Sequence, residues 1–315
     1  MTHRIDQAAQ FGKVAVLMGG DSSEREISLK SGDAVLQSLL RSEVDAHGVD
    51  PSKADLLQLR LAGFDRAFIV LHGRGGEDGV IQGALEAIGL PYTGTGVMGS
   101  ALGMDKLRTK LLWQGVGLAT PAYRLLSADC DFSEVVKAVG LPMIVKPAAE
   151  GSSIGMSKVT TADELPRAWE KAASGGAVVL AERWVEGAEY TVAILQGEAL
   201  PLIRVETPRE FYDYEAKYQS SETGYLCPCG LAGAQETTLQ QLALSAFDAV
   251  GCRGWGRVDL ICDAQGKAWL IEVNTVPGMT NHSLVPMAAE AAGLTFDELV
   301  WRILETSEIE VADGE

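Results

Sequence analysis

The stretch GWGRVDLICDAQGKAWLIEVNT, residues 254–275, contains two strand-like runs separated by a short polar turn. Side chains two positions apart share one face of a strand, so Glu272 and Asn274 point the same way. Arg257 and Asp259 share a face of the other strand for the same reason. If the strands pair, Asp259, Glu272 and Asn274 converge as three oxygen ligands. Such a set suits Mg²⁺ or Mn²⁺ bound together with nucleotide phosphates.

A solvated hairpin face is the alternative for these carboxylates. The side chains expected on the opposite faces are all apolar, and they are Val258, Leu260, Ile271 and Val273. Buried carboxylates need a counter-charge, which two metal ions with bridging carboxylates would supply. The spacing therefore favours a two-metal site over a solvated turn.

The composition is that of a globular protein, since 47% of the 315 residues are hydrophobic and 22% are charged. The length predicts two or three domains. A net charge of −17 leaves too few lysines and arginines to neutralise a duplex nucleic acid, which excludes that partner. The 35 glycines indicate many tight turns or close approaches of backbone to ligand. We expect a cytoplasmic protein with no membrane partner. The sequence shows no apolar run of membrane length, no signal-peptide pattern and no disulfide framework.

The order of elements predicts three regions. Strand, loop and helix alternate early in the chain, which predicts a parallel α/β domain over 1–103. A central subdomain with a helix at 162–173 is expected over 104–190, and a C-terminal subdomain over 191–315. The polar stretch 207–224 is long for a loop, so we expect a lid there. Short strands are expected at 141–146, 156–160, 178–182, 190–195, 200–205, 256–262 and 268–273.

The segment KPAAEGSSIG, residues 146–155, is a candidate phosphate-binding loop. A strand delivers Lys146, and a glycine-serine loop follows whose backbone N–H groups could cradle phosphates. It differs from a Walker A loop because the lysine precedes the glycines and a strand follows. A plain hairpin turn explains this segment equally well.

The same residues also fit a serine hydrolase. Residues 151–155 match G-x-S-x-G with Ser153 as nucleophile, and Asp259 and His282 follow in the order of that fold. A nucleophile elbow requires a strand-to-helix turn, however, and 156–160 is strand-like. The hydrolase hypothesis also leaves the Glu272 region unexplained, so the sequence favours the phosphate loop and metal site over a hydrolase.

The N-terminal region offers two glycine-rich segments. His72 follows a predicted strand at 66–71, and the carboxyl ends of parallel strands are where open α/β sheets bind ligands. A packed histidine capping a turn is the alternative. Ser23 and Glu26 have capping-box spacing and predict the start of a helix. Glu24 either contacts a ligand or interacts with the helix dipole.

Two further patterns have ordinary structural explanations. Lys106 and Lys110 lie four residues apart on a predicted helix, which is typical of solvated lysines. Asn281 or Ser283 is expected to cap a helix that begins near Val285.

Seven segments, in this order and spacing, resemble one family along nearly the whole chain. They are GGDSSEREISLKSG (19–32), HGRGGEDGVIQG (72–83), MDKLRTK (104–110), KPAAEGSSIGMSKV (146–159), FYDYEAKY (211–218), GWGRVDL (254–260) and IEVNTVPGMTNHSLVP (271–286). The family is the D-alanine–D-alanine ligases of the ATP-grasp superfamily. The resemblance implies an α/β and α+β architecture, an ATP-grasp fold with an N-terminal Rossmann-like parallel domain. It also implies ATP-dependent synthesis of D-alanyl-D-alanine for peptidoglycan through a D-alanyl phosphate, by a homodimer.

The resemblance implies roles for individual residues. ATP would be held by Lys106, Lys146, Glu150, Gly151, Ser152, Ser153, Glu182, Arg183, Trp184, Val185, Glu189 and Lys217. The two D-alanines would contact Glu24, His72, Arg257, Gly278, Ser283 and Leu284, and two metal ions would bind Asp259, Glu272 and Asn274. The catalytic set would be Glu24, Ser152, Tyr218, Arg257, Gly278 and Ser283. Within it, Arg257 and the Gly278 N–H would hold the developing oxyanion.

Tyr218 bears on specificity in this resemblance. Ser152 and Tyr218 would form a hydrogen-bonded network with Glu24. Phenylalanine in place of the tyrosine accompanies acceptance of D-lactate in the family, so Tyr218 favours D-alanine. The alternatives are a ligase for another carboxylate and amine, a serine hydrolase using Ser153, or a nucleotide-binding regulator without turnover.

Overall fold

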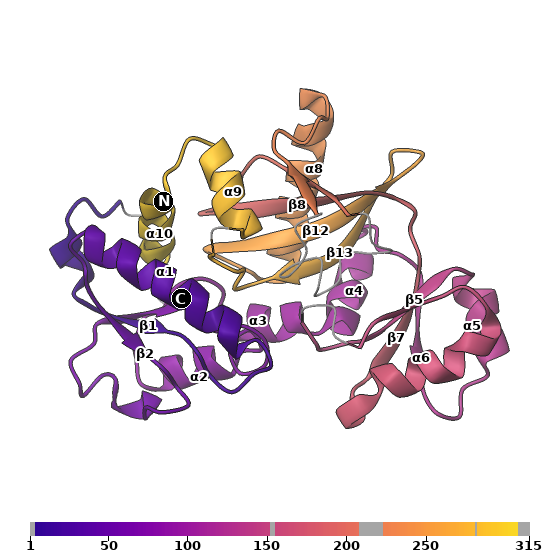
Figure 1. The fold of residues 1–315 in the computed structure, drawn as a ribbon, viewed down its shortest axis with the longest axis horizontal. Helices are drawn as coiled ribbons and strands as arrows, with labels where there is room; N and C mark the ends of the chain where they lie inside the picture. Colours follow the sequence, from indigo (N-terminus) through magenta and orange to yellow (C-terminus); the bar gives the residue numbers. More distant parts are fainter. Residues whose placement is uncertain (1–3, 152–154, 208–222, 281, 308–315) are drawn as a thin grey trace, which may run out of the picture.

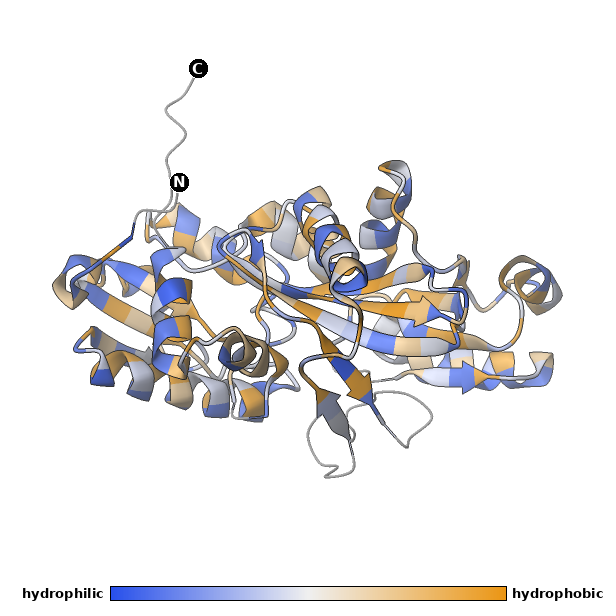
Figure 2. Ribbon diagram, turned by 90° about the horizontal axis from the view of Figure 1, so that it is seen from above, coloured by the Kyte–Doolittle hydropathy of each residue, from blue (hydrophilic) through white to orange (hydrophobic). Residues whose placement is uncertain are grey.

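The computed structural model describes residues 4–151, 155–207, 223–280 and 282–307. Three β-sheets follow one another along the long axis of the molecule, and helices cover them (Figure 1). Hydrophobic stretches occupy the strands of the largest sheet, while the helices carry hydrophilic beside hydrophobic segments (Figure 2). In the described part of the chain, no helix is both long enough and apolar enough to cross a membrane.

The N-terminal sheet has three parallel strands in the order β2-β1-β3. Its elements are β1 (Lys13–Leu17), α1 (Arg25–Arg41), β2 (Asp45–Val49), β3 (Arg66–Ile69), α2 (Val80–Ala87) and α3 (Val97–Met104). The predicted capping box is wrong, because Glu24 occupies the N-cap position of α1 and makes no side-chain cap bond. The Ser22 hydroxyl instead accepts the Glu24 N–H at 3.1 Å and donates to the His72 carbonyl at 2.7 Å. This places Glu24 beside the loop that follows β3.

The second sheet is antiparallel and has the order β4-β7-β5-β6. Its elements are β4 (Tyr123–Leu126), α5 (Phe132–Val139), β5 (Met143–Pro147), β6 (Ser157–Val159), α6 (Leu165–Ala172) and β7 (Val179–Arg183). The β-branched and other apolar residues of β5 and β7 pack against α5 and α6 in one hydrophobic cluster. The strands predicted for this part of the chain are confirmed within three residues at each end.

The third sheet has six strands, with β11-β10-β8-β12-β13 in order and β9 paired to β8. Its elements are α4 (Lys106–Gly115), β8 (Gly187–Leu195), β9 (Glu198–Ala199), β10 (Ile203–Glu206), β11 (Gly224–Leu226), α8 (Gly233–Ala249), β12 (Trp255–Asp263) and β13 (Ala268–Asn274). Helix α8 packs on β8, β12 and β13. The buried Trp113 of α4 donates its indole N–H to the Ala246 carbonyl of α8 at 2.9 Å.

The pairing of β12 with β13 confirms the predicted hairpin and corrects one face of it. Asp259 pairs with Glu272, but the register then shifts, so that Leu260 pairs with Leu270. Ile271 is the extra residue of this bulge. It therefore leaves the apolar face expected from strict alternation and lines the same cavity as Glu272.

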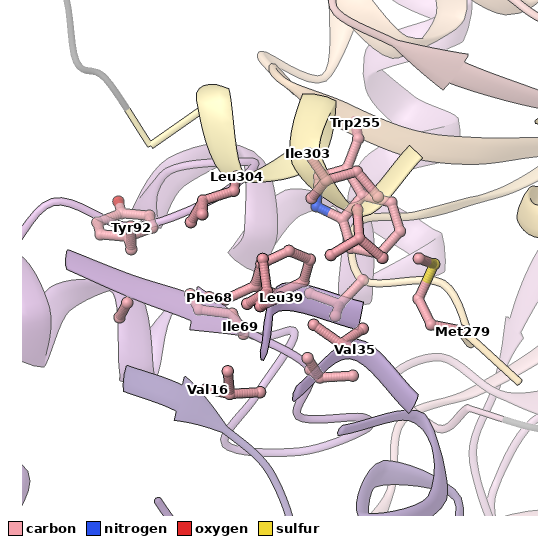
Figure 3. Packing of buried hydrophobic residues seen from close by; sticks show 14 of the residues in the cluster. Val16, Val35, Leu39, Phe68, Ile69, Tyr92, Trp255, Met279, Ile303 and Leu304 are labelled. Carbon is pink, nitrogen blue, oxygen red and sulfur yellow. The ribbon is translucent and has the colours of Figure 1, made fainter. Parts of the chain in front are cut away.

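The last two helices, α9 (Leu284–Ala291) and α10 (Phe296–Glu305), complete the core of the N-terminal sheet. Figure 1 shows α10 beside α1, at the opposite end of the colour scale, and α9 packs against α10. Figure 3 shows Ile303 of α10 and Trp255 of β12 over Phe68 of β3. One hydrophobic cluster thus joins both ends of the chain. The division at 103 and 190 stays a prediction.

Candidate active site

A cavity of about 520 Å³ separates the second sheet from the third. This volume lies in the range of cofactor sites. Ten of the residues predicted to hold nucleotide or metal line it: Lys106, Lys146, Glu150, Glu182, Arg183, Trp184, Val185, Glu189, Asp259 and Glu272. Apolar side chains for which no binding role is predicted line it as well, namely Ile144, Met156, Val205, Ile261 and Ile271. Charged groups and an apolar surface therefore meet in one cavity.

The segment between β7 and β8, which we call the hinge segment, connects the second sheet to the third and forms one wall of the cavity. The backbone N–H of Arg183 donates to the Ala122 carbonyl at 2.8 Å, and that of Trp184 donates to Pro142 at 3.1 Å. The Lys158 ammonium lies 4.3 Å from the centre of the Trp184 ring, a cation–π contact. Lys158 was missed by the motif analysis, because one lysine on a short strand carries no distinctive signal.

The inner end of the cavity holds two lysines that share one carboxylate. Lys146 Nζ lies 3.1 Å from Glu182 Oε1, and Lys110 Nζ lies 2.5 Å from Glu182 Oε2. Burial opposes ionisation of Glu182, but the two lysines outweigh it and lower the pKa of the carboxyl. The expectation that Lys110 is solvated is wrong, since its exposed fraction is 0%. The Glu182 side chain is thus engaged by both lysines, while its backbone lies within β7 between β4 and β5.

The predicted metal ligands come together on β12 and β13. Arg257 donates to both Asp259 oxygens at 2.8 Å, and Thr191 donates to Oδ1 at 2.6 Å. Asn274 Nδ2 donates to Asp259 Oδ2 at 3.2 Å. Glu272 Oε2 lies 3.3 Å from the Lys106 ammonium. Each carboxylate therefore already faces one cationic side chain.

This donor set fits a hard divalent cation. Two carboxylates and an amide offer only oxygen ligands, which Mg²⁺ and Mn²⁺ prefer. No group of three or more His, Cys, Asp or Glu side chains within the described ranges is arranged to hold a metal. A metal here would consequently combine Asp259 and Glu272 with the amide oxygen of Asn274.

Next to the cavity, two glutamates meet at glycine loops. A Cβ on Gly73 would lie 2.7 Å from Glu24 Oε2, and one on Gly151 would lie 2.6 Å from the same atom. The Gly73 N–H donates to Glu77 Oε2 at 2.6 Å. Burial and the neighbouring Glu24 raise the pKa of Glu77 to about 8. No predicted role included Glu77, and its raised pKa favours the protonated form of this carboxyl.

His72 joins the N-terminal sheet to the segment after β13. Its Nδ1 lies 2.9 Å from the Val276 carbonyl, and its Nε2 lies 3.4 Å from the Ser31 hydroxyl. The carbonyl can only accept, so Nδ1 carries the proton and Nε2 accepts from Ser31. Ser31 also accepts the Met279 N–H at 3.1 Å. Burial lowers the pKa of His72 to about 4, so the ring is neutral and holds this segment in place.

Gly278, Ser283 and Leu284 follow this junction in the chain. Ser283 is at the N-cap position of α9, but its hydroxyl makes no cap bond. It accepts the Thr280 N–H at 2.9 Å instead, so a capping role for its side chain is wrong. A Cβ on Gly278 would lie 2.9 Å from the Ser283 hydroxyl oxygen. Glycine therefore allows the close approach of backbone and hydroxyl at the start of α9.

Several predicted features lie outside the described residues. They are Ser152, Ser153, Lys217, Tyr218 and Asn281, with all of the expected lid except its ends. Strand β6 follows the phosphate loop and pairs antiparallel with β5. A nucleophile elbow requires a helix after the loop, whereas a strand follows here, so the hydrolase hypothesis loses its structural basis.

A cavity of this size between two antiparallel sheets, with Lys146 and Lys158 on the second sheet and Asp259 and Glu272 on the third, is the arrangement of an ATP-grasp enzyme. Two family models match the sequence. The model described as D-ala D-ala ligase C-terminus matches residues 112–305, and that described as D-ala D-ala ligase N-terminus matches residues 52–95. The chain belongs to the D-alanine–D-alanine ligase family.

Individual relatives agree with the family models. The D-alanine–D-alanine ligase of Methylococcus capsulatus is 59% identical over 98% of this chain and 99% of its own length. That of Alkalilimnicola ehrlichii is 62% identical over 95% of this chain and 96% of its own. The ATP complex of the Bacillus anthracis ligase matches 94% of this chain and 97% of its own with a TM-score of 0.82 at 31% identity. The predicted fold class is therefore confirmed.

Proposed function

We propose that this protein joins two D-alanines to D-alanyl-D-alanine with consumption of ATP, for the synthesis of peptidoglycan precursors. Relatives about 60% identical over nearly the whole chain carry this name, which supports the assignment. The first D-alanine carboxylate attacks the γ-phosphate to give D-alanyl phosphate and ADP. The amine of the second D-alanine then attacks the activated carbonyl and displaces phosphate.

The nucleotide half of the site uses the cavity between the sheets. Lys106 and Lys146 line it and are proposed to bind the phosphates. The hinge residues Arg183 to Val185 and Glu189 are proposed to hold adenine and ribose. Asp259, Glu272 and Asn274 would hold two Mg²⁺ or Mn²⁺ ions, which when bound supply positive charge to the transferring phosphoryl group.

The amino-acid half is proposed to lie around Glu24. Its carboxylate would bind the ammonium of the first D-alanine, and neutral His72 would hold the segment after β13 in place. Ser283 and Leu284 are proposed to receive the carboxylate of the second D-alanine. Arg257 and the Gly278 N–H would stabilise the oxyanion, where one lost donor typically costs ~10²–10³ in rate.

One observation carries the proposal, namely the direct pairing of Arg257 with Asp259. Asp259 lines the nucleotide cavity, whereas Arg257 lowers the pKa of both His72 and Glu77 through its charge. The two side chains are held together at 2.8 Å. The place where phosphoryl transfer would occur is thereby adjacent to the place where the amino acids would bind.

The decisive experiment measures phosphate release with ATP and Mg²⁺ in the presence of D-alanine, L-alanine or D-lactate. Of the three compounds, we expect only D-alanine to cause phosphate release. We also expect this activity to be lost when the metal is chelated and in the Asp259→Asn variant. Absence of D-alanine-dependent release would refute the proposal. Loss of activity in Ser153→Ala, with Asp259→Asn unaffected, would favour a hydrolase instead.

Three finer features belong to the same proposal. We propose that residues 207–224 close over the site and exclude water from the acyl phosphate. A cytoplasmic location and a homodimer are proposed from the family. Sedimentation of the purified protein tests the oligomeric state, and a monomer at micromolar concentration would contradict it.

A further inference from the structure

Lys110 is a buried cation that the proposed reaction leaves unused. It lies on α4 with an exposed fraction of 0%. Its ammonium contacts Glu182 Oε2 at 2.5 Å and the Thr120 hydroxyl at 2.5 Å. Burial lowers the pKa of Lys110 to about 8, and Glu182 partly opposes this effect. Burying a charged side chain costs free energy, so we expect Lys110 to have a role beyond helix packing.

The two lysines at Glu182 differ in how tightly they hold it. Lys110 lies at 2.5 Å from one carboxylate oxygen, whereas Lys146 lies at 3.1 Å from the other. Of these two lysines, Lys146 lines the cavity and Lys110 does not. Lys110 is therefore the closer and more deeply placed partner, and Lys146 is the looser one that faces the nucleotide side.

We propose that Lys110 is a positioning residue that engages Glu182 so that the Lys146 ammonium remains available to a nucleotide phosphate. This role rests on the proposed binding of ATP. Two lysines on one carboxylate leave one positive charge uncompensated, and a phosphate oxygen can compensate it. Without Lys110, the carboxylate and Lys146 form a neutral pair, which competes with the phosphate for the same ammonium.

The contacts of Thr120 add a second element to this role. Its hydroxyl accepts from Lys110 and donates to the Leu270 carbonyl of β13 at 2.9 Å. Glu182 belongs to β7 in the second sheet, while Leu270 belongs to the third. Lys110 therefore connects the two walls of the cavity at their inner end, where the position of Lys146 is set.

A double-mutant cycle on the full-length protein tests the proposal. The dissociation constant of ATP is measured by calorimetry for wild type, Lys110→Met, Glu182→Gln and the double variant. We expect Lys110→Met to weaken binding about tenfold in the wild-type background and less than threefold in Glu182→Gln. Lys137→Met is the matched control, because Lys137 pairs with Glu134 on the exposed face of α5 and should leave the constant unchanged.

Each outcome of the cycle decides one question. The role of Lys110 would be overturned if Lys110→Met raised the dissociation constant of ATP by the same factor in both backgrounds, or did not change it at all. Either result would leave the proposed binding of ATP intact. A wild-type protein that binds no ATP would instead overturn the proposed function. If Lys110→Met does not fold, Lys110→Gln, which retains an N–H donor for Thr120, enters the same cycle with the same criteria.

Discussion

The shifted pKa values of Glu77 and His72 should have opposite effects on how the free energy of unfolding depends on pH. The substitution Glu77→Gln should reveal this opposition. The folded pKa of Glu77 is about 8, against 4.5 for the free residue. Between these values the folded state binds a proton that the unfolded state lacks, so Glu77 adds stability as the pH falls. The folded pKa of His72 is about 4, against 6.5, so the unfolded state binds the extra proton and stability falls with the pH.

The two effects oppose each other between about pH 5 and pH 6.5. A difference of one bound proton changes the free energy of unfolding by about 1.4 kcal/mol per pH unit. Over this interval His72 alone would remove about 2 kcal/mol. Glu77 is only partly buried, so its opposing contribution is about 1–2 kcal/mol. We therefore expect a nearly flat curve in wild type and a loss of about 1–2 kcal/mol on acidification in Glu77→Gln.

Urea unfolding at pH 5, 5.5, 6 and 6.5 measures this difference, provided that the urea dependence is the same for both proteins. Glutamine keeps the hydrogen bond from the Gly73 N–H and removes only the titration. Glu26→Gln is the matched control, because Glu26 is exposed and should leave the slope of wild type unchanged. Parallel curves for wild type and Glu77→Gln would show that Glu77 is ionised in the folded protein, and the reasoning would fail.

Two further substitutions test other contacts. Gly151→Ala places a Cβ 2.6 Å from Glu24 Oε2, so the carboxylate must move. We expect the KM for D-alanine to rise about tenfold and the midpoint of unfolding to stay unchanged. A KM within twofold of wild type would contradict this. Arg25 holds the pKa of Asp50 below its usual range, so the pair stabilises the fold above the unfolded pKa of 3.8. Asp50→Asn should cost about 1–3 kcal/mol at pH 7 and progressively less below pH 3.8, and a constant difference in acid unfolding would refute the ion pair.

The sequence alone predicts the strands of the site well, because alternation along β12 and β13 is a local property. Strand pairing then brings Asp259 opposite Glu272 and Asn274 opposite Arg257, close to the expected convergence. Alternation cannot predict the bulge that follows, since a shift in register depends on the partner strand. The apolar contribution of Ile271 to the cavity was missed for this reason.

Other features depend on packing between distant segments. Two lysines four residues apart on a helix look alike in sequence, yet Lys106 is partly exposed and Lys110 is fully buried. Only the placement of Thr120 and Glu182 around α4 distinguishes them. The packing of α10 on α1 has the same origin, since residues such as Leu39 and Ile303 are far apart in the chain.

The strongly acidic composition is compatible with a phosphate ligand because long-range and local electrostatics differ. Exposed charges are screened over about 8 Å at physiological ionic strength, so most of the net charge of −17 acts weakly on the cavity. In and beside the cavity, four cations and three carboxylates form three ion-paired groups: Lys110 and Lys146 with Glu182, Lys106 with Glu272, and Arg257 with Asp259. The uncompensated cation belongs to the group around Glu182, where burial makes its field strong. If this reasoning is right, raising the salt concentration should weaken ATP binding only modestly, whereas Lys110→Met should weaken it markedly at every salt concentration.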